Sequence, residues 1–249
     1  MCGRYMVLSS PEAIRRLFGY PEQPNFPPRY NVAPTQPIAI VRSVEGRRQF
    51  ALVRWGLIPP WVKNPRVFTL LINARIESVN DKAAFRNAMR RRRCLVPADG
   101  FYDWKDDGGR RRPHCVRSRE RGPIAFAGLW ETWIGPNGEE METAAIITTP
   151  ANRELARLHD RMPAIVPPEN FEAWLDCGKV DAETAAALCA PAREGLLETY
   201  EISTAVNRTE NDGPELIAPV SDQPPTAEAD TPVKRAKKPK TDERQSSLF

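Results

Sequence analysis

Long apolar runs are missing from this sequence of 249 residues. No stretch approaches the roughly 18 consecutive apolar residues that a membrane-spanning helix requires. The first residues, MCGRYMVLSS, also lack the basic region followed by a longer apolar one that marks a secretion signal. We therefore expect a soluble cytoplasmic protein with neither a membrane span nor a secretory leader.

Histidine and closely spaced cysteine are scarce as well. The sequence has two histidines, His114 and His159, and its five cysteines include no CxxC pair. An odd number of widely spaced cysteines argues against a disulfide framework, and neither histidine has a second metal ligand at zinc-like spacing. We expect no metal site and no cofactor.

The charge balance is only mildly basic, with 36 Lys and Arg against 32 Asp and Glu. Such an excess permits nucleic-acid binding without requiring it. Composition changes near residue 220, because residues 221–249 are rich in proline and charge and almost free of apolar residues before the last two. That segment cannot bury enough surface to offset its ordering entropy. The sequence therefore predicts one globular domain, residues 1–220, followed by a disordered basic tail, residues 221–249.

Strand patterns dominate the predicted domain. Short segments rich in β-branched and aromatic residues lie at residues 4–8, 36–42, 49–57, 113–118, 123–133, 143–149 and 198–203. Helices are predicted at residues 11–18 between Ser10 and Gly19, at residues 81–93 with Asn80 as the cap, and at residues 168–176 and 182–190. Because strands and helices do not alternate, we expect an α+β domain with a mixed, mostly antiparallel sheet and short flanking helices.

The first chemical signal is the cysteine that follows the initiator methionine, which is removable because Cys2 is small. Removal of Met1 places an amine of pKa about 7.7–8.0 and a thiol of pKa about 8.5 on one carbon atom. The amine can attack an aldehyde, after which the thiol closes a five-membered thiazolidine ring. In the alternative chemistry the thiol is the nucleophile and the amine is its base, as in N-terminal-nucleophile amidotransferases, which also often begin with MCG.

Downstream motifs distinguish these two classes. MCGRY is followed in order by RYNVAPTQ (29–36), RWGLIPPW (54–61), INARIES (72–78), RRCLVPADGFYDW (92–104) and LHDRMPAI (158–165). This series resembles the SRAP family, named for SOS-response-associated peptidases and also known as abasic-site-processing proteins. The resemblance runs from residue 2 to about residue 203, whereas the amidotransferases share only the MCG start.

The resemblance implies a protein that binds single-stranded DNA at an abasic site and links Cys2 to the sugar aldehyde as a thiazolidine, which shields the lesion. It implies that Cys2 is the nucleophile, oriented by Asn73. The acidic residue of GFYDW, Asp103, assists opening of the sugar ring, and His159 is the second acid–base group. Taken singly, Asn73 could cap a turn, Asp103 could be a surface charge and His159 a core histidine; their matched motifs favour the catalytic roles.

One residue departs from the family pattern. The family usually has Glu in GFYEW, whereas this chain has Asp103, which is one methylene shorter. A displacement of about 1 Å in an active site can change a rate by about two orders of magnitude. We therefore expect slower ring opening here, with the carboxyl acting through a water or with the backbone compensating.

The family pattern also implies a set of DNA contacts. Arg4, Arg75 and Arg161 are expected on phosphates, Trp61 as a stacking wedge, and Asn31 and Thr148 lining the site. Trp55, by contrast, is expected in the core. The arginine run at residues 90–93 fits either a DNA contact or a solvated helix face.

The chain ends in QSSLF, and Gln245, Leu248 and Phe249 resemble the motif by which bacterial replication proteins dock on the sliding clamp. We therefore expect single-stranded DNA with abasic sites as the first partner, and the clamp as a second one at the replication fork and nucleoid. A monomer is expected. Two other functions stay open: an N-terminal-nucleophile hydrolase or peptidase, and a non-catalytic single-strand-binding module recruited by the clamp.

Overall fold

The computed structural model describes residues 2–222, and these residues form two sheets. The smaller sheet has the order β13-β8-β7-β1-β2, and the larger one has the order β11-β10-β4-β3-β6-β9-β12, with β5 beside β10. Strands of the smaller sheet are β1 (Tyr5–Val7), β2 (Arg29–Val32), β7 (Gly100–Asp107), β8 (Arg110–Ser118) and β13 (Leu197–Glu201). Strands of the larger sheet are β3 (Pro37–Val44), β4 (Arg47–Trp55), β5 (Asn73–Arg75), β6 (Arg93–Ala98), β9 (Ile124–Ile134), β10 (Glu140–Pro150), β11 (Arg161–Pro163) and β12 (Ile165–Val166).

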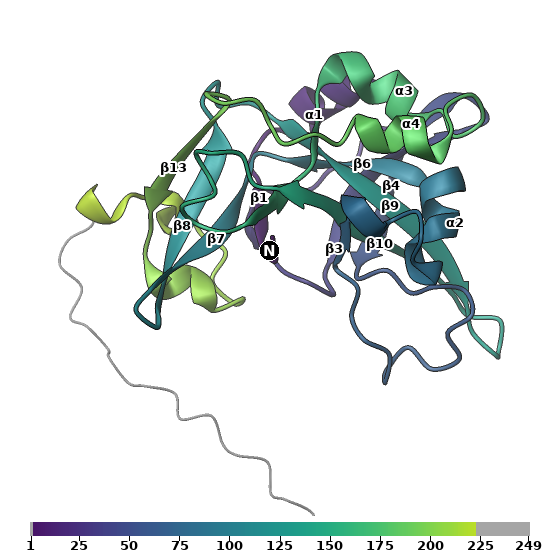
Figure 1. The fold of residues 1–249 in the computed structure, drawn as a ribbon, viewed down its shortest axis with the longest axis horizontal. Helices are drawn as coiled ribbons and strands as arrows, with labels where there is room; N and C mark the ends of the chain where they lie inside the picture. The colour runs from purple at the N-terminus through teal and green to yellow at the C-terminus, as the bar shows by residue number, and fades with distance from the viewer. Residues whose placement is uncertain (1, 223–249) are drawn as a thin grey trace, which may run out of the picture.

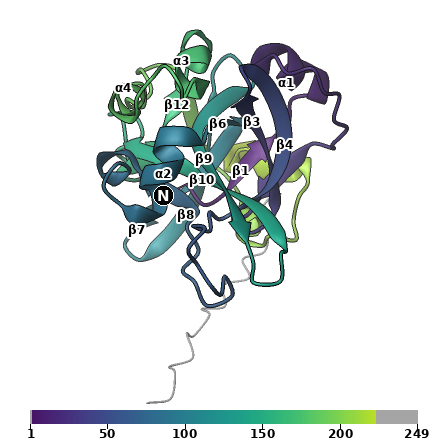
Figure 2. The ribbon, with the colours of Figure 1, turned by 90° about the vertical axis from the view of Figure 1, so that its right-hand side faces the viewer.

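The helices are few and short, and they flank the larger sheet. They are α1 (Pro11–Phe18), α2 (Ala83–Arg91), α3 (Phe171–Leu175) and α4 (Ala182–Ala187). Single 3₁₀ turns add η1 (Ile76–Ser78), η2 (Pro168–Asn170), η3 (Thr204–Asn207), η4 (Pro214–Ile217) and η5 (Val220–Asp222). Figure 2 shows α1 and α3 near each other at one end of the sheet. None of the helices built by the described residues is long and apolar enough to cross a membrane.

The predicted α+β class with a mixed, mostly antiparallel sheet is confirmed. Parallel pairing occurs where β10 runs beside β4 and β5, and the other ladders of the two sheets are antiparallel among the described residues. The predicted helix at residues 11–18 is also confirmed at both ends. The Ser10 hydroxyl accepts a hydrogen bond from Ala13 N–H, and Gly19 ends the helix with a φ of 70°.

The helix predicted at residues 81–93 is wrong at both ends. It begins at Ala83 with Lys82 at the cap position, so Asn80 is not its cap. It ends at Arg91, because Arg93 enters β6 and buries its guanidinium. That group donates to the carbonyl oxygens of Met89, Trp174, Asp176 and Val180 at 2.6–3.0 Å, which satisfies its buried N–H groups. Arg93 is therefore a core residue rather than part of a solvated face.

A C-terminal segment, residues 204–217, covers the outer face of the smaller sheet. Its buried side chains Val206 and Leu216 pack with Met6, Tyr102 and Cys115 in a hydrophobic cluster separate from the main core. The main core lies on the opposite face of the same sheet, where Phe101 and Val116 point. The smaller sheet is thus buried on both sides, as the alternation of side chains along a strand allows.

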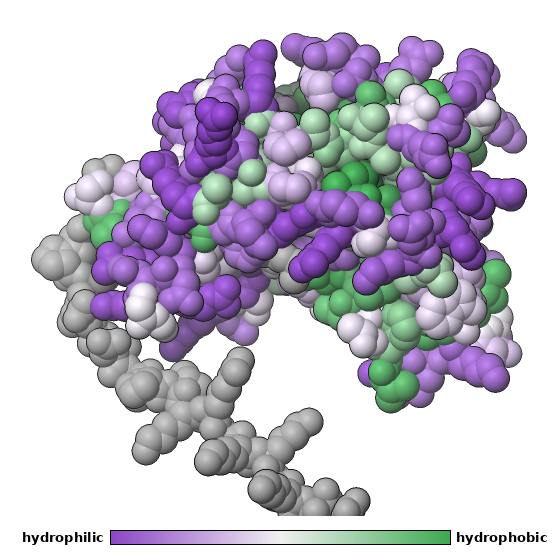
Figure 3. Space-filling view, in the orientation of Figure 1, coloured by the Kyte–Doolittle hydropathy of each residue, from purple (hydrophilic) through white to green (hydrophobic). Residues whose placement is uncertain are grey.

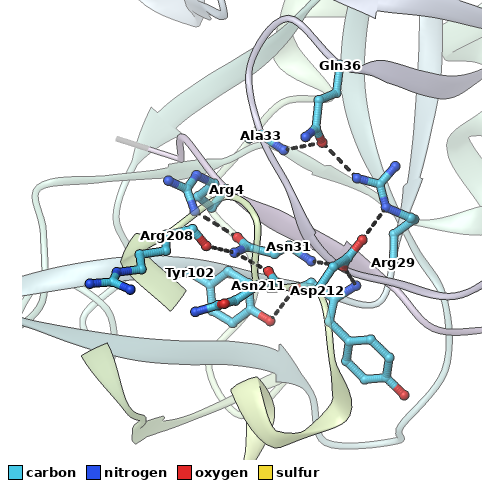
Figure 4. A network of polar contacts seen from close by, with 10 residues as sticks. Arg4, Arg29, Asn31, Ala33, Gln36, Tyr102, Arg208, Asn211 and Asp212 are labelled. Atoms are coloured by element: carbon cyan, nitrogen blue, oxygen red, sulfur yellow. Dashed lines mark hydrogen bonds and ion pairs between the residues drawn. The ribbon is translucent and has the colours of Figure 1, made fainter. Parts of the chain in front are cut away.

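Buried polar contacts fasten this segment to the beginning of the chain (Figure 4). Asn31 is fully buried and its amide donates to the carbonyls of Val206, Arg208 and Asn211 at 2.8–3.2 Å. The Asn31 side-chain oxygen accepts from Arg4 at 2.8 Å. The two ends of the domain are therefore joined through one side chain that makes four hydrogen bonds.

Replacement of Asn31 by Ala should lower the free energy of unfolding by about 2–4 kcal/mol, because it strands several buried polar groups at once. Urea unfolding at neutral pH measures this change. Asn137→Ala, at an exposed turn position, is the control and should shift stability by less than about 0.5 kcal/mol. Equal stability of the two variants would contradict the role of Asn31 as the fastening residue.

Candidate active site

The N-terminal segment extends β1 between the two sheets. Tyr102 N–H donates to the Arg4 carbonyl at 3.0 Å, which continues the antiparallel pairing of β1 with β7. This register places Gly3 opposite Asp103. Cys2 precedes Gly3 at the end of this strand pair. It is fully buried, and its Sγ lies 3.7 Å from the Arg4 carbonyl oxygen. In Figure 1 this segment lies between the β7–β8 hairpin and the loop that connects β4 to β5.

Asn73 holds the backbone of Cys2 from the other sheet. It is the first residue of β5, where parallel pairing with Ile146 of β10 fixes its direction. Its Nδ2 donates to the Cys2 carbonyl at 2.8 Å, and its buried Oδ1 has no hydrogen-bond partner among the described residues. A buried amide oxygen without a partner is unfavourable and rare. Asn73 therefore offers an acceptor beside the backbone of Cys2.

Asp103 supplies a buried carboxyl to the same region. It is 4% exposed, and one of its oxygens accepts from the Trp104 N–H at 2.9 Å. Burial raises the pKa of Asp103, and the neighbouring charge of His159 and the Trp104 hydrogen bond oppose this shift only in part. A carboxyl that keeps its proton to a higher pH than an ordinary aspartate can act as an acid.

His159 lies in the turn before β11 and is within electrostatic range of Asp103. Its Nδ1 is 3.0 Å from the Arg161 N–H and 2.6 Å from a carboxyl oxygen of Asp160. One ring nitrogen can accept from the first or, when protonated, donate to the second. Nδ1 therefore has both a donor and a possible acceptor within hydrogen-bond distance.

The thiol of Cys2 is held in its neutral form. Burial raises its pKa well above the usual range, and the nearby Asp103 raises it further. All five cysteines of the chain are free thiols. A neutral, buried thiol is a poor first nucleophile, because the thiolate is the reactive species. The site thus favours reaction through the amine before the thiol.

Arg161 and Thr148, both predicted to contact DNA, are buried in the structure and bonded to each other. Arg161 is 8% exposed and donates to the Thr148 carbonyl at 2.6 Å. Both terminal nitrogens of Arg161 also pair with the carboxylate of Glu77, at 2.5 and 3.0 Å. Its guanidinium is therefore already engaged, and this geometry favours a structural role for Arg161 next to His159. Glu77 was not predicted as a site residue, and its only signal in the sequence is its place inside INARIES.

Arg4 and Asn31 belong to the fastening network rather than to an open surface. Arg4 donates to the Val206 carbonyl at 2.7 Å and to the Asn207 carbonyl at 3.1 Å, besides Asn31. Burial lowers its pKa. The expectation that Asn31 lines a cleft is wrong, because its side chain is 0% exposed and its amide is consumed by backbone carbonyls. Asp212, which bonds the backbone N–H groups of Tyr30 and Asn31, was not predicted.

Trp61 and Arg75 are the predicted DNA contacts that do face solvent. Trp61 is 58% exposed on the loop between β4 and β5. Its ring packs edge-on against that of Phe68, with the ring centroids 5.7 Å apart. Arg75 is exposed at the end of β5, two residues from Asn73. Trp55 is fully buried, which confirms the contrast predicted between the two tryptophans. In the space-filling view the lower edge of the molecule is hollowed between this loop and the β7–β8 hairpin (Figure 3).

Two other features lie apart from this region. One cavity has a volume of about 580 Å³, and none of the predicted site residues lines it. Its walls come from α1, α3, α4, β9 and β12. Within residues 2–222, no group of three or more His, Cys, Asp or Glu side chains is placed to hold a metal ion.

The four predicted catalytic residues thus converge from four different segments of the chain. The domain is thus β-rich, with a buried cysteine at position 2 that is held by an asparagine and lies in electrostatic range of a carboxyl. The family model for SOS response associated peptidase (SRAP) matches residues 1–209. The chain belongs to the SRAP family.

Named relatives support the same assignment. "Abasic site processing protein YoqW" of Bacillus subtilis is 37% identical over 221 residues, covering 87% of this chain and 99% of the relative. "Abasic site processing protein YedK" of Escherichia coli is 31% identical over 227 residues, covering 88% of this chain and all of the relative. A crystal structure of a protein from Bacteroides thetaiotaomicron matches with a TM-score of 0.79 and 25% identity, covering 88% of this chain and 99% of that one.

The Arg161–Glu77 pair generates a prediction about acid stability. The hydrogen bond from Arg161 lowers the pKa of Glu77 below its ordinary value of 4.5. The pair therefore stabilises the fold above that value, and its contribution is lost as pH falls through the lowered pKa. Glu77→Gln should remove about 1 kcal/mol at pH 7 and make stability less dependent on acid, because the carboxylate is half exposed.

Urea unfolding at pH 7 and at about pH 3 measures both effects. Glu140→Gln, at an exposed position of β10, is the matched control and should change neither value. An unchanged acid dependence in Glu77→Gln would show that the pair does not hold Arg161 in place.

Proposed function

We propose that this chain processes abasic sites in single-stranded DNA by forming a covalent thiazolidine through Cys2 after removal of Met1. The observation that carries the proposal is that Asn73 holds the buried Cys2 by its carbonyl, while Asp103 lies in electrostatic range of both Cys2 and His159. Membership of the SRAP family and the names of the relatives point to the same substrate. Such an adduct would shield the lesion from strand cleavage.

The first step is the release of an aldehyde from the closed sugar of the abasic site. A protonated Asp103 gives its proton to the ring oxygen, and the proton of the anomeric hydroxyl is removed, so that the C–O bond of the ring breaks. Burial of Asp103 suits this step because it keeps the carboxyl protonated to a higher pH. The free amine of Cys2 then attacks the aldehyde carbon.

Loss of water and ring closure complete the adduct. His159 protonates the hydroxyl of the carbinolamine, which leaves as water, and then takes back the N–H proton, so that a neutral Schiff base remains. The Cys2 thiol adds to the same carbon, and its proton passes to the nitrogen. The atoms balance as amine plus thiol plus aldehyde giving thiazolidine plus one water.

Asn73 is the group we expect to set the state of the amine. Its Oδ1 can accept a hydrogen bond from the Cys2 nitrogen while its Nδ2 holds the Cys2 carbonyl. An uncharged amide does this without favouring the protonated amine, which a carboxylate would do. The amine is thus oriented and remains available as a nucleophile.

The DNA strand would lie across the hollow at the lower edge of the molecule. Trp61 offers an exposed aromatic face that can stack where the lesion leaves a neighbouring base without a partner. Arg75 offers an exposed charge for a phosphate beside Asn73. No base-reading element is required, because the reactive sugar itself supplies selectivity.

Cys2→Ala should abolish the adduct, and Cys2→Ser should give at most a weak and labile one, because an oxazolidine reopens easily. The measurement is a denaturing gel of protein with an abasic oligonucleotide, together with intact mass to show that Met1 is absent. A heat-stable adduct of Cys2→Ala would falsify the mechanism. Amide hydrolysis without any adduct would favour the N-terminal-nucleophile hydrolase instead, and a salt-sensitive complex alone would favour a non-catalytic binding module.

The tail carries a separate proposal. Gln245, Leu248 and Phe249 lie outside the described residues, and we propose that they bind the replication sliding clamp. A Leu-Phe pair can enter an apolar pocket while the Gln side chain bonds at its rim. Deletion of residues 245–249 should abolish pull-down of the clamp and leave adduct formation intact. Undiminished pull-down by the deleted chain would refute this role.

A further inference from the structure

His114, the second histidine of the chain, lies directly beside Asp103 in the smaller sheet. Antiparallel pairing of β7 with β8 sets Asp103 opposite His114, and pairing of β8 with β13 sets His114 opposite Glu201. Residues directly opposite each other in such a ladder point to the same face, with Cβ atoms about 4.5–5.5 Å apart. Three ionisable side chains therefore form one row, which the register of β1 continues to Gly3, the residue next to Cys2.

The row leads from the buried site to solvent. Asp103 is 4% exposed, His114 is half-buried, and the Glu201 side chain is 39% exposed. The neighbouring row toward the interior, Phe101 and Val116, belongs to the main core. The core residues thus shield Asp103 from solvent on one side. His114, its neighbour across the ladder, is more exposed.

The tautomer of His114 suits it to receive a proton from Asp103 or to return one. Its Nδ1 lies 3.1 Å from the Arg112 carbonyl oxygen, which can only accept, so Nδ1 carries a hydrogen. In the neutral ring Nε2 then keeps its lone pair. His114 has two charged neighbours, the cation Arg112 on its own strand and the anion Glu201 on β13. The Arg112 Nη1 and a Glu201 carboxyl oxygen are 3.6 Å apart.

Other charged groups act on Asp103 as well. The charges that act on Asp103 include those of His159 and Arg111, and the Cys2 thiol is a further titratable neighbour; His114 lies opposite Asp103 by strand register. Because His159 is assigned to the dehydration step, it is engaged when Asp103 must be restored. His114 is the other imidazole of the chain, and it lies across the ladder from Asp103.

We propose that His114 exchanges the proton of Asp103 with solvent during ring opening of the abasic sugar. Asp103 gives its proton to the ring oxygen and is left as a carboxylate. The imidazolium of His114 returns a proton to Asp103 from Nε2 and is recharged from water near Glu201. The proton of the anomeric hydroxyl leaves to solvent, so the total is unchanged. His114 acts through Asp103 and is a positioning residue; the inference rests on the proposed function.

The kinetic test compares adduct formation in His114→Phe and wild type from about pH 5 to pH 9. His114→Phe keeps an aromatic ring and should be slower by about tenfold, below the roughly 100-fold of a direct general acid. It should also lose one inflection of the pH profile. Imidazole added to His114→Ala should restore most of the lost rate. Thr199→Val, on the same face one row nearer the core, is the matched control and should react like wild type.

A second background separates this role from a structural one. If His114 acts only through Asp103, then His114→Phe should cause no further loss in an Asp103→Asn chain. An equal loss in both backgrounds, or an unchanged rate and pH profile in His114→Phe, would overturn the proposal.

An NMR measurement without DNA distinguishes failure of the role proposed for His114 from failure of the proposed function. Because the chain has two histidines, their ring protons give two resolvable NMR signals. The His114 signal should respond to the titration of Asp103, and this response should vanish in Asp103→Asn. A wild-type His114 signal that Asp103→Asn leaves unchanged at every pH would overturn the role of His114 even if the adduct forms. A response to Asp103 with no adduct in wild type would instead refute the proposed function.

Discussion

The structure depends on holding a chain end in a buried position, which is unusual because the first residues of most domains are poorly ordered. Two contacts achieve this. Asn73 donates to the Cys2 carbonyl, and the Arg4 guanidinium is fixed by Asn31 and by the carbonyls of Val206 and Asn207. One contact comes from the larger sheet and the other from the C-terminal segment. Both sheets therefore have to be in place before the reactive residue has a defined environment.

Burial then determines the chemistry. Desolvation raises the pKa of the Cys2 thiol and that of Asp103, so both groups carry protons where their exposed counterparts would not. A site of this kind suits an acid-assisted reaction of an amine with an aldehyde better than attack by a thiolate. The same burial separates Asp103 from bulk water, which is why a neighbouring titratable side chain matters. The row of Asp103, His114 and Glu201 is a consequence of strand register and not of a sequence motif.

Much of this could be predicted from the sequence, because local signals carried it. Ser10 and Gly19 marked the ends of α1, and the matched motifs indicated the four residues that converge on the site. Strands β6 and β7 were missed as strands, since Pro97, Asp99 and Gly100 interrupt the apolar pattern there. The buried arginines could not be predicted, because a guanidinium looks solvated until the carbonyls or the carboxylate that satisfy it are brought in from distant segments. The buried position of Asn31 could not be predicted for the same reason, because the carbonyls to which its amide donates come from a distant segment.

The fastening of Arg4 by residues 206 and 207 has a consequence for biosynthesis. The ribosome makes the cysteine end first, but the carbonyls that anchor it come more than 200 positions later, after β13. Contacts between such distant parts of a chain form late in folding. Cys2 is therefore exposed when it leaves the ribosome. It becomes buried only when synthesis of the domain is nearly finished. A truncated translation product would have Cys2 without the C-terminal contacts that hold the start of the chain in place.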